Sequence, residues 1–177
     1  MTTTKWVLDP THSEIGFKVK HMMFTSVSGS FNSFEVTAET DNDDFLDAKI
    51  EFKANVNSVS TNNEQRDSHL KSADFFDAEN FPIITFSATE LKLNSLDDYT
   101  LTGNLTIKGI TKSIQLDVEN GGFMKDPWGN LKAGFSILGK INRTDFGLVW
   151  NAALETGGVL VSEEVRINCE IQLVKQA

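Results

Sequence analysis

Arginine is rare in this chain, and two of its three arginines have an aspartate close by. Arg66 is followed directly by Asp67, and Arg143 is followed by Asp145 two positions later. A guanidinium group can bind a carboxylate or a phosphate through two parallel hydrogen bonds, so each arginine could hold an anionic group of a ligand. Each could equally form a structural ion pair at the end of an element. We favour the structural role for Arg143 and leave both roles open for Arg66.

The three histidines, His12, His21 and His69, raise the question of a metal site. His21 continues the apolar side of an alternating run, whereas His12 precedes that run and would point the other way in an extended chain. Zinc needs several ligands that converge at about 2.0–2.1 Å, and this spacing does not predict convergence. We therefore expect no metal and no cofactor, and a hydrogen-bonding role for the histidines.

The motifs of nucleophilic and phosphate chemistry are missing from the sequence. No Gly-rich phosphate loop precedes a helix, and no serine lies in a G-x-S-x-G motif. The single cysteine, Cys169, lies in an alternating run without an evident base, which is typical of a small buried apolar residue. We therefore expect no catalytic residues.

Most of the chain alternates apolar and polar residues in steps of two, as strands with one buried face do. Turn-like segments separate about eight such runs, including weaker ones near residues 34–38 and 148–152. In one run, Leu131, Ala133, Phe135 and Ile137 share a parity that Gly139 interrupts. The sequence predicts a single all-β domain over residues 1–177, either a sandwich or a barrel.

Residues 62–79 break this alternation. Thr61 and Glu64 have the spacing of a capping box, and neither proline nor glycine occurs from residue 64 to residue 77. The segment therefore predicts a short helix within about 62–79 that ends before Pro82. With Phe75 and Phe76 at its exit, such a helix is suited to covering one end of a barrel.

The charge balance disfavours nucleic acid as a partner. Sixteen basic residues stand against 25 acidic ones, so the formal net charge is −9 and the pI is about 4.8. The first residues, MTTTKWVLDP, lack the apolar core of a signal peptide, and no apolar run has the length of a membrane-spanning helix. We expect a cytoplasmic protein that is not an integral membrane protein, or a periplasmic one if the chain is a processed form. Monomer and homodimer both remain open.

Four stretches of the sequence resemble the signature segments of the YceI-like, polyisoprenoid-binding proteins. They occur in the same order and span nearly the whole chain: DPTHSEIGFKVKHMMFTSVSGSFNSFE, RDSHLKSADFFDAENFPIITFSAT, LTGNLTIKGITKSI and INRTDFG. The resemblance implies an eight-stranded antiparallel, lipocalin-like barrel with a helical segment near one end. It also implies an elongated apolar pocket that holds an isoprenoid chain.

On this resemblance, we expect a protein without enzymatic activity that binds, stores or transports a long-chain isoprenoid lipid of the polyprenyl or quinone-precursor type. Arg66, Asp67, His69 and Arg143 would form a polar rim for a diphosphate or quinone head group. The expected pocket wall consists of Phe17, Val19, His21, Phe31, Leu70, Phe75, Phe76, Phe86, Phe135 and Ile137.

Two other functions are left open by the sequence. An enzyme acting on the same lipids could use Asp67 and His69 as an acid–base pair near Arg66. A barrel filled by its own side chains could instead serve as a protein-interaction module. An eight-stranded barrel is just wide enough either to be filled by side chains or to hold one small ligand, so strand count does not separate these functions.

Overall fold

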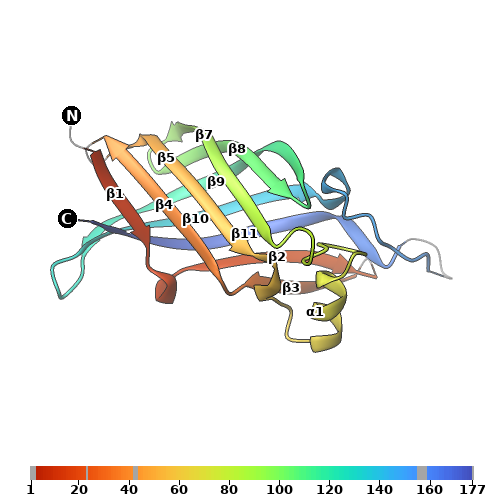
Figure 1. The fold of residues 1–177 in the computed structure, drawn as a ribbon. Helices are drawn as coiled ribbons and strands as arrows, with labels where there is room; N and C mark the ends of the chain where they lie inside the picture. Colours follow the sequence, from red (N-terminus) through yellow and green to blue (C-terminus); the bar gives the residue numbers. More distant parts are fainter. Residues whose placement is uncertain (1–2, 23, 42–43, 155–158, 177) are drawn as a thin grey trace.

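The computed structural model describes residues 3–22, 24–41, 44–154 and 159–176, and most of them lie in one antiparallel sheet (Figure 1). One helix and three short 3-10 turns interrupt the strands: α1 (Glu64–Lys71), η1 (Pro10–His12), η2 (Val56–Ser58) and η3 (Arg143–Phe146). The strands are β1 (Thr3–Leu8), β2 (Glu14–His21), β3 (Thr25–Phe31), β4 (Phe34–Asp41), β5 (Asp44–Asn55), β6 (Val59–Ser60), β7 (Ile83–Ser95), β8 (Asp98–Ile107), β9 (Ile110–Lys125), β10 (Leu131–Asn142) and β11 (Val161–Lys175).

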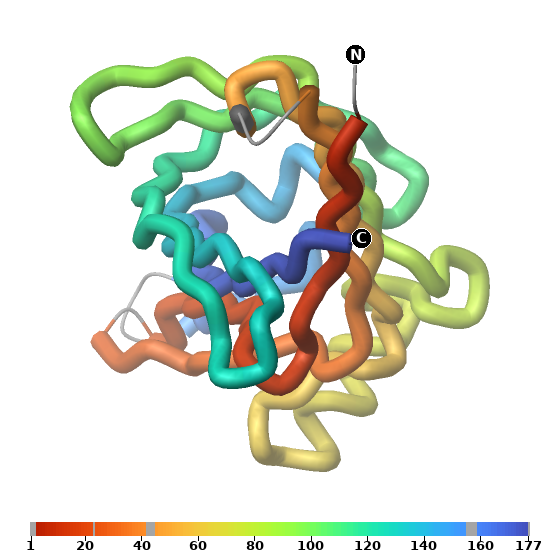
Figure 2. Tube along the Cα trace, turned by 90° about the vertical axis from the view of Figure 1, so that its left-hand side faces the viewer, coloured from red at the N-terminus to blue at the C-terminus, as the bar shows by residue number. Residues whose placement is uncertain are grey.

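Eight of these strands form a closed ring. The order around the ring is β1, β4, β5, β7, β8, β9, β10 and β11, and β11 pairs again with β1. Viewed from the end that carries both chain termini, the strands surround a central axis (Figure 2). The expected eight-stranded antiparallel barrel is therefore confirmed.

The three remaining strands lengthen the barrel toward α1. Both β1 and β2 pair antiparallel with β11, β1 with its C-terminal end and β2 with its N-terminal part. They are therefore two segments of one strand position, separated by η1. In the same way, β3 pairs with β2 while β4 pairs with β1, and the short β6 pairs with β3.

The predicted helical segment is present but its helix is short. Helix α1 covers Glu64–Lys71, and turns follow it, in which the backbone N–H of Phe76 donates to the carbonyl of Leu70. The N-cap is Asn63, whose side chain accepts a hydrogen bond from the Arg66 backbone. The expected capping residue, Thr61, is instead engaged by two charged side chains of α1.

The weak alternating run at residues 148–152 does not form a strand, contrary to expectation. The carbonyls of Leu148 and Trp150 accept hydrogen bonds from the Arg143 side chain, and the Asn151 side chain bonds the backbone of Val161. Side chains thus form hydrogen bonds with the backbone groups that would otherwise pair with a neighbouring strand. A two-residue pattern over so short a stretch could not reveal this competition.

The predicted inward row on β10 is present. Ala133 is fully buried, Phe135 and Ile137 face the interior, and a Cβ atom added at Gly139 would collide with the side chain of Leu116. A larger residue at that point of the row would force the Leu116 side chain on the neighbouring strand to move. Ala133 packs in a cluster with Trp6 at the end that carries the termini.

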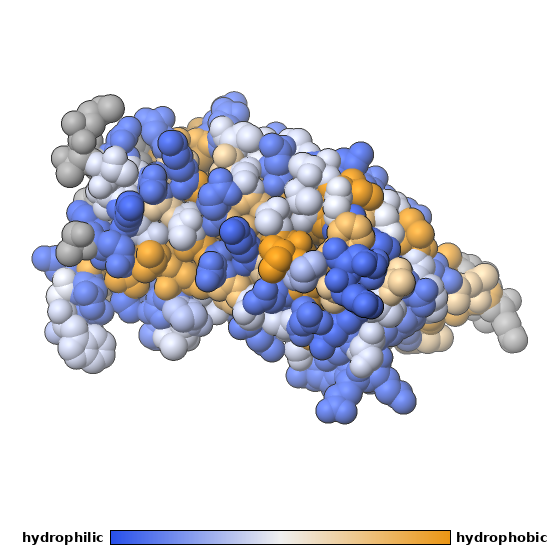
Figure 3. Space-filling model, in the orientation of Figure 1, coloured by the Kyte–Doolittle hydropathy of each residue, from blue (hydrophilic) through white to orange (hydrophobic). Residues whose placement is uncertain are grey.

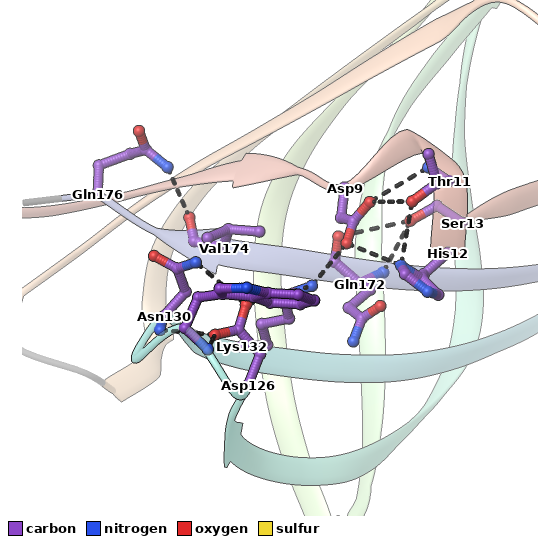
Figure 4. Close-up of polar contacts among 11 residues, drawn as sticks. Asp9, Thr11, His12, Ser13, Asp126, Asn130, Lys132, Gln172, Val174 and Gln176 are labelled. Atoms are coloured by element: carbon purple, nitrogen blue, oxygen red, sulfur yellow. Dashed lines mark hydrogen bonds and ion pairs between the residues drawn. The ribbon is translucent and has the colours of Figure 1, made fainter.

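A polar cluster outside the barrel joins η1 to the turn between β9 and β10 (Figure 4). Asp9 accepts hydrogen bonds from Lys132 Nζ at 2.8 Å and from Thr11, and its carboxylate lies 2.9 Å from His12 Nδ1. Lys132 Nζ also lies 3.8 Å from Asp126, which accepts backbone hydrogen bonds inside the turn. The hydrogen bond from Lys132 is the main reason that the pKa of Asp9 lies well below its ordinary range.

We predict that Asp9→Asn lowers the free energy of unfolding by about 1–2 kcal/mol at pH 7, because a charge-assisted hydrogen bond becomes a neutral one. Folding lowers the pKa of Asp9, so the stabilisation is fully present above the unfolded pKa of about 3.9 and is lost as the pH falls below it. The difference between wild type and variant should therefore be constant from pH 7 to pH 5 and shrink below about pH 4.

Urea denaturation at stepped pH measures this difference. Asp47→Asn, which alters an exposed aspartate on β5, is the matched control and should change little at any pH. A difference between wild type and Asp9→Asn that stays the same down to pH 2.5 would contradict the role of the charge.

A second prediction concerns the packing around β10. Ala133→Phe should lower the free energy of unfolding by about 1–3 kcal/mol, because a close-packed interior has no room for the added ring. Leu138→Phe, on the solvent face of the same strand at 60% exposure, should have almost no effect. Equal stability of the two variants in chemical denaturation would show that the space around Ala133 is loosely packed.

Candidate ligand-binding cavity

The interior of the barrel is hollow over much of its length. A cavity of about 590 Å³ runs inside it, which is within the range of roughly 300–1,000 Å³ found for small-molecule pockets. Its wall is almost entirely aliphatic and aromatic, because the inward residues of successive strands are apolar. The cavity therefore suits a large apolar ligand.

Each of the ten residues predicted for the pocket wall lines this cavity. Phe31 connects the wall to the segment after α1, since its ring lies 5.7 Å from that of Phe17 and 5.8 Å from that of Phe76, measured between centroids. Contact of these side chains with a ligand stays a prediction. The ten are Phe17, Val19, His21, Phe31, Leu70, Phe75, Phe76, Phe86, Phe135 and Ile137.

The cavity reaches the surface beside α1. Of the described residues that line it, only Asn63 and Gln65 are exposed, and both belong to the start of this helix. Other polar lining groups, including Thr61, Arg66 and His69, are at the same end. In the space-filling view, the surface over α1 is predominantly hydrophilic (Figure 3). The cavity is therefore an apolar tube whose opening is lined by polar residues.

Arg66 and Asp67 are joined through Thr61 and not directly. Arg66 donates from Nε to the Thr61 hydroxyl and from Nη2 to the Thr61 carbonyl, both at 2.7 Å. Asp67 accepts from the backbone N–H of Thr61 at 2.8 Å and from its hydroxyl at 2.6 Å. Arg66 lines the cavity, whereas Asp67 is not one of its lining residues. Contact of either side chain with a ligand head group stays a prediction. Among the described residues, no hydrogen bond engages Nη1 of Arg66.

His69 pairs with Asp74 and not with Asp67. Its Nε2 lies 2.9 Å from the Asp74 carboxylate, and its ring packs edge-on against Trp150 and Phe75 at centroid distances of 4.6 and 5.0 Å. The alternative acid–base pair of Asp67 and His69 therefore does not form in this geometry. His69 instead packs α1 against the segment that follows η3.

Arg143 is buried at the mouth, with 3% of its surface exposed. It donates to the carbonyls of Leu148, Trp150, Ser162 and Val161 at 2.6, 2.9, 2.8 and 3.3 Å. No ion pair of the described residues joins it to Asp145. We therefore correct the expected partner: Arg143 is structural, as favoured, but it holds backbone carbonyls. Arg143 also lines the cavity, and its contact with a ligand head group stays a prediction.

Metal-binding and redox groups are sparse in the described parts of the chain. His12 lies outside the barrel in the cluster around Asp9, while His21 and His69 line the cavity, so the three histidines are dispersed. No three side chains of His, Cys, Asp or Glu gather as a metal site within the described ranges. Burial raises the pKa of the Cys169 thiol to about 11, which keeps it protonated at neutral pH.

The far end of the cavity is closed by aromatic rings that sequence reasoning did not group. Trp6, Phe45, Phe123 and Phe135 come from four strands, and their neighbouring centroids lie 5.0–6.1 Å apart. Only Phe135 was predicted as a wall residue. Because strand pairing alone brings these residues together, no local pattern could have identified the group. Trp150 and Gln65 at the mouth were also missed.

The chain matches the YceI-like domain family over residues 6–173. A UPF0312 protein of Staphylococcus aureus is 39% identical, and the match covers 96% of each chain. The crystal structure of the Campylobacter jejuni YceI protein is 33% identical with a TM-score of 0.77, and covers 96% of this chain and 97% of its own.

A polyisoprenoid-binding domain from Saccharophagus degradans has the same fold, with a TM-score of 0.67 at 14% identity over 97% of this chain and 98% of its own. No helix in the described residues is both long and apolar enough to cross a bilayer. The family match spans the barrel from Trp6 on β1 to Leu173 on β11 and so includes every strand that bounds the cavity. The chain therefore belongs to the YceI-like family.

Proposed function

We propose that this protein binds a long-chain isoprenoid lipid without covalent chemistry, and stores or carries it with the chain inside the barrel. One observation carries the proposal: the cavity wall is apolar along its length, and the described lining residues that are fully exposed, Asn63 and Gln65, lie at the polar start of α1. An amphipathic lipid matches this division. The family match, together with the fold shared with a polyisoprenoid-binding domain of Saccharophagus degradans, supports the choice of an isoprenoid chain.

Burial of the chain provides the affinity. Each CH₂ group removed from water contributes about 0.8 kcal/mol, so even a modest prenyl chain would gain more than 10 kcal/mol before costs. Ordering the flexible chain and restricting its motion consume much of this gain. The bound state is therefore stable without a covalent bond, and the lipid can still leave.

The mouth supplies a place for a polar or anionic head group. Arg66 donates to Thr61 through Nε and Nη2. Among the described residues, its Nη1 makes no hydrogen bond. Asn63 and Gln65 add exposed amide groups beside it. We assign the diphosphate or quinone head group to this position, and we assign no catalytic role to any residue around it.

Mass spectrometry of an organic extract tests the proposal. Protein purified from its own host without detergent should release an isoprenoid lipid, and the delipidated protein should bind a fluorescent prenyl lipid again. A preparation that contains no isoprenoid and does not bind added prenyl lipid would overturn the proposal. Turnover of the extracted lipid by the pure protein would instead make it an enzyme.

The head-group position leads to a separate prediction. Arg66→Met should weaken binding of a prenyl diphosphate by about 1.5–3 kcal/mol, the contribution of a hydrogen bond to a charged group. Binding of the bare hydrocarbon of equal length should hardly change, because the apolar wall is intact. Equilibrium titration of the delipidated protein with both ligands measures the difference.

Lys71→Met is the matched control for this prediction. It removes a positive charge from the same helix at a residue that does not line the cavity, so it should leave both affinities close to wild type. Equal weakening of the diphosphate and the hydrocarbon by Arg66→Met would make Arg66 purely structural.

A further inference from the structure

The closed end of the cavity has two layers of aromatic rings. Phe45 and Phe135 line the cavity, and their centroids are 5.1 Å apart at 65°. Trp6 and Phe123 are not part of the lining but pack behind them, with Trp6 5.0 Å and Phe123 6.1 Å from Phe45. Phe45 and Phe135, together with Leu173 on β11, therefore separate the cavity from the rear rings at this end.

The rear layer keeps the front layer in place. Trp6 is completely buried and its indole Nε1 donates to the hydroxyl of Thr40 at 3.2 Å, so its ring has a fixed position behind Phe45. Phe123 is 45% exposed, which shows that solvent begins on its far side. The cavity thus cannot be extended past these rings without a change in side-chain volume.

We infer that Phe45 and Phe135 select the length of the bound chain by ending the tube, an inference that rests on the proposed function. A cavity of about 150 Å³ holds one benzene molecule, so this cavity of about 590 Å³ encloses on the order of two dozen carbons. That corresponds to about four or five isoprene units. Units beyond this number must stay outside the mouth.

Affinity should therefore rise with chain length and then stop rising. Every unit inside the tube is removed from water, whereas a unit outside it is not. A longer chain also displaces its head group from the position beside Arg66. We call the chain length at which affinity stops rising the break, and its value shows where Phe45 and Phe135 end the tube.

Equilibrium binding of linear prenyl alcohols from three to eight isoprene units to the delipidated protein tests the inference. In wild type the affinity should stop rising near four or five units. In Phe135→Ala or Phe45→Ala the break should move to a chain one unit longer, whose affinity should rise at least about tenfold, which equals about 1.4 kcal/mol. Ile137→Phe, which adds volume two residues nearer the mouth on β10, should move the break to a shorter chain.

Leu138→Ala is the matched control, because it shortens a side chain on the solvent face of β10 that does not line the cavity, and it should leave the break where it is. If the alanine variants at the front layer do not fold, Phe135→Leu and Ile137→Phe still test the inference. Phe135→Leu should move the break to a longer chain, and Ile137→Phe should move it to a shorter one. The same break in wild type and in every folded front-layer variant would overturn the inference while leaving prenyl binding intact. A wild type that binds no prenyl alcohol of any length would instead refute the proposed function.

Discussion

Three residue pairs between β1 and β11 close the sheet, and the hollow interior depends on this closure. Closure pairs every strand of the ring on both sides and turns every second side chain inward. The inward residues are mostly apolar, so the enclosed space offers water few hydrogen-bond partners. Trp6 lies at the seam itself, paired with Lys175 on one side and Ala38 on the other. The seam that closes the barrel thus also supplies the indole that supports one end of the cavity.

At the other end, the buried guanidinium group of Arg143 fixes the backbone around the mouth of the cavity. Burying a guanidinium group is costly unless its donors are satisfied, and Arg143 satisfies them with four backbone carbonyls. Those carbonyls belong to the segment after η3 and to the start of β11. The segment is thereby held at the mouth in a form that is not a strand, with Leu148 and Trp150 facing the cavity. Packing of His69 on Trp150 then joins this segment to α1.

The two ends differ in polarity, and this difference orients an amphipathic ligand. A polar group placed among Phe45 and Phe135 would lose its hydrogen bonds to water without replacement, at a cost of several kcal/mol. The same group beside Arg66, Asn63 and Gln65 finds donors and remains close to solvent. For the lipid of the proposed function, this difference favours the apolar chain inside the tube and the head group at the mouth. Orientation follows from solvation alone and requires no moving part.

Features that depend on neighbours along the chain were predictable from the amino-acid sequence. Alternation in steps of two predicted the strands and their inward faces. A Lys-Gly pair supports the tight turn between β8 and β9, in which Lys108 and Gly109 have positive φ angles of 52° and 74°. Tertiary structure alone decided which residues meet across the barrel. Asp9 with Lys132, Arg143 with the carbonyls near Trp150, and Phe45 with Phe135 are each brought together by strand order and register. The alternation in the sequence shows which face of a strand a residue occupies. It does not show which residues of distant strands lie at the same height along the barrel axis, because the register of the closed ring decides this.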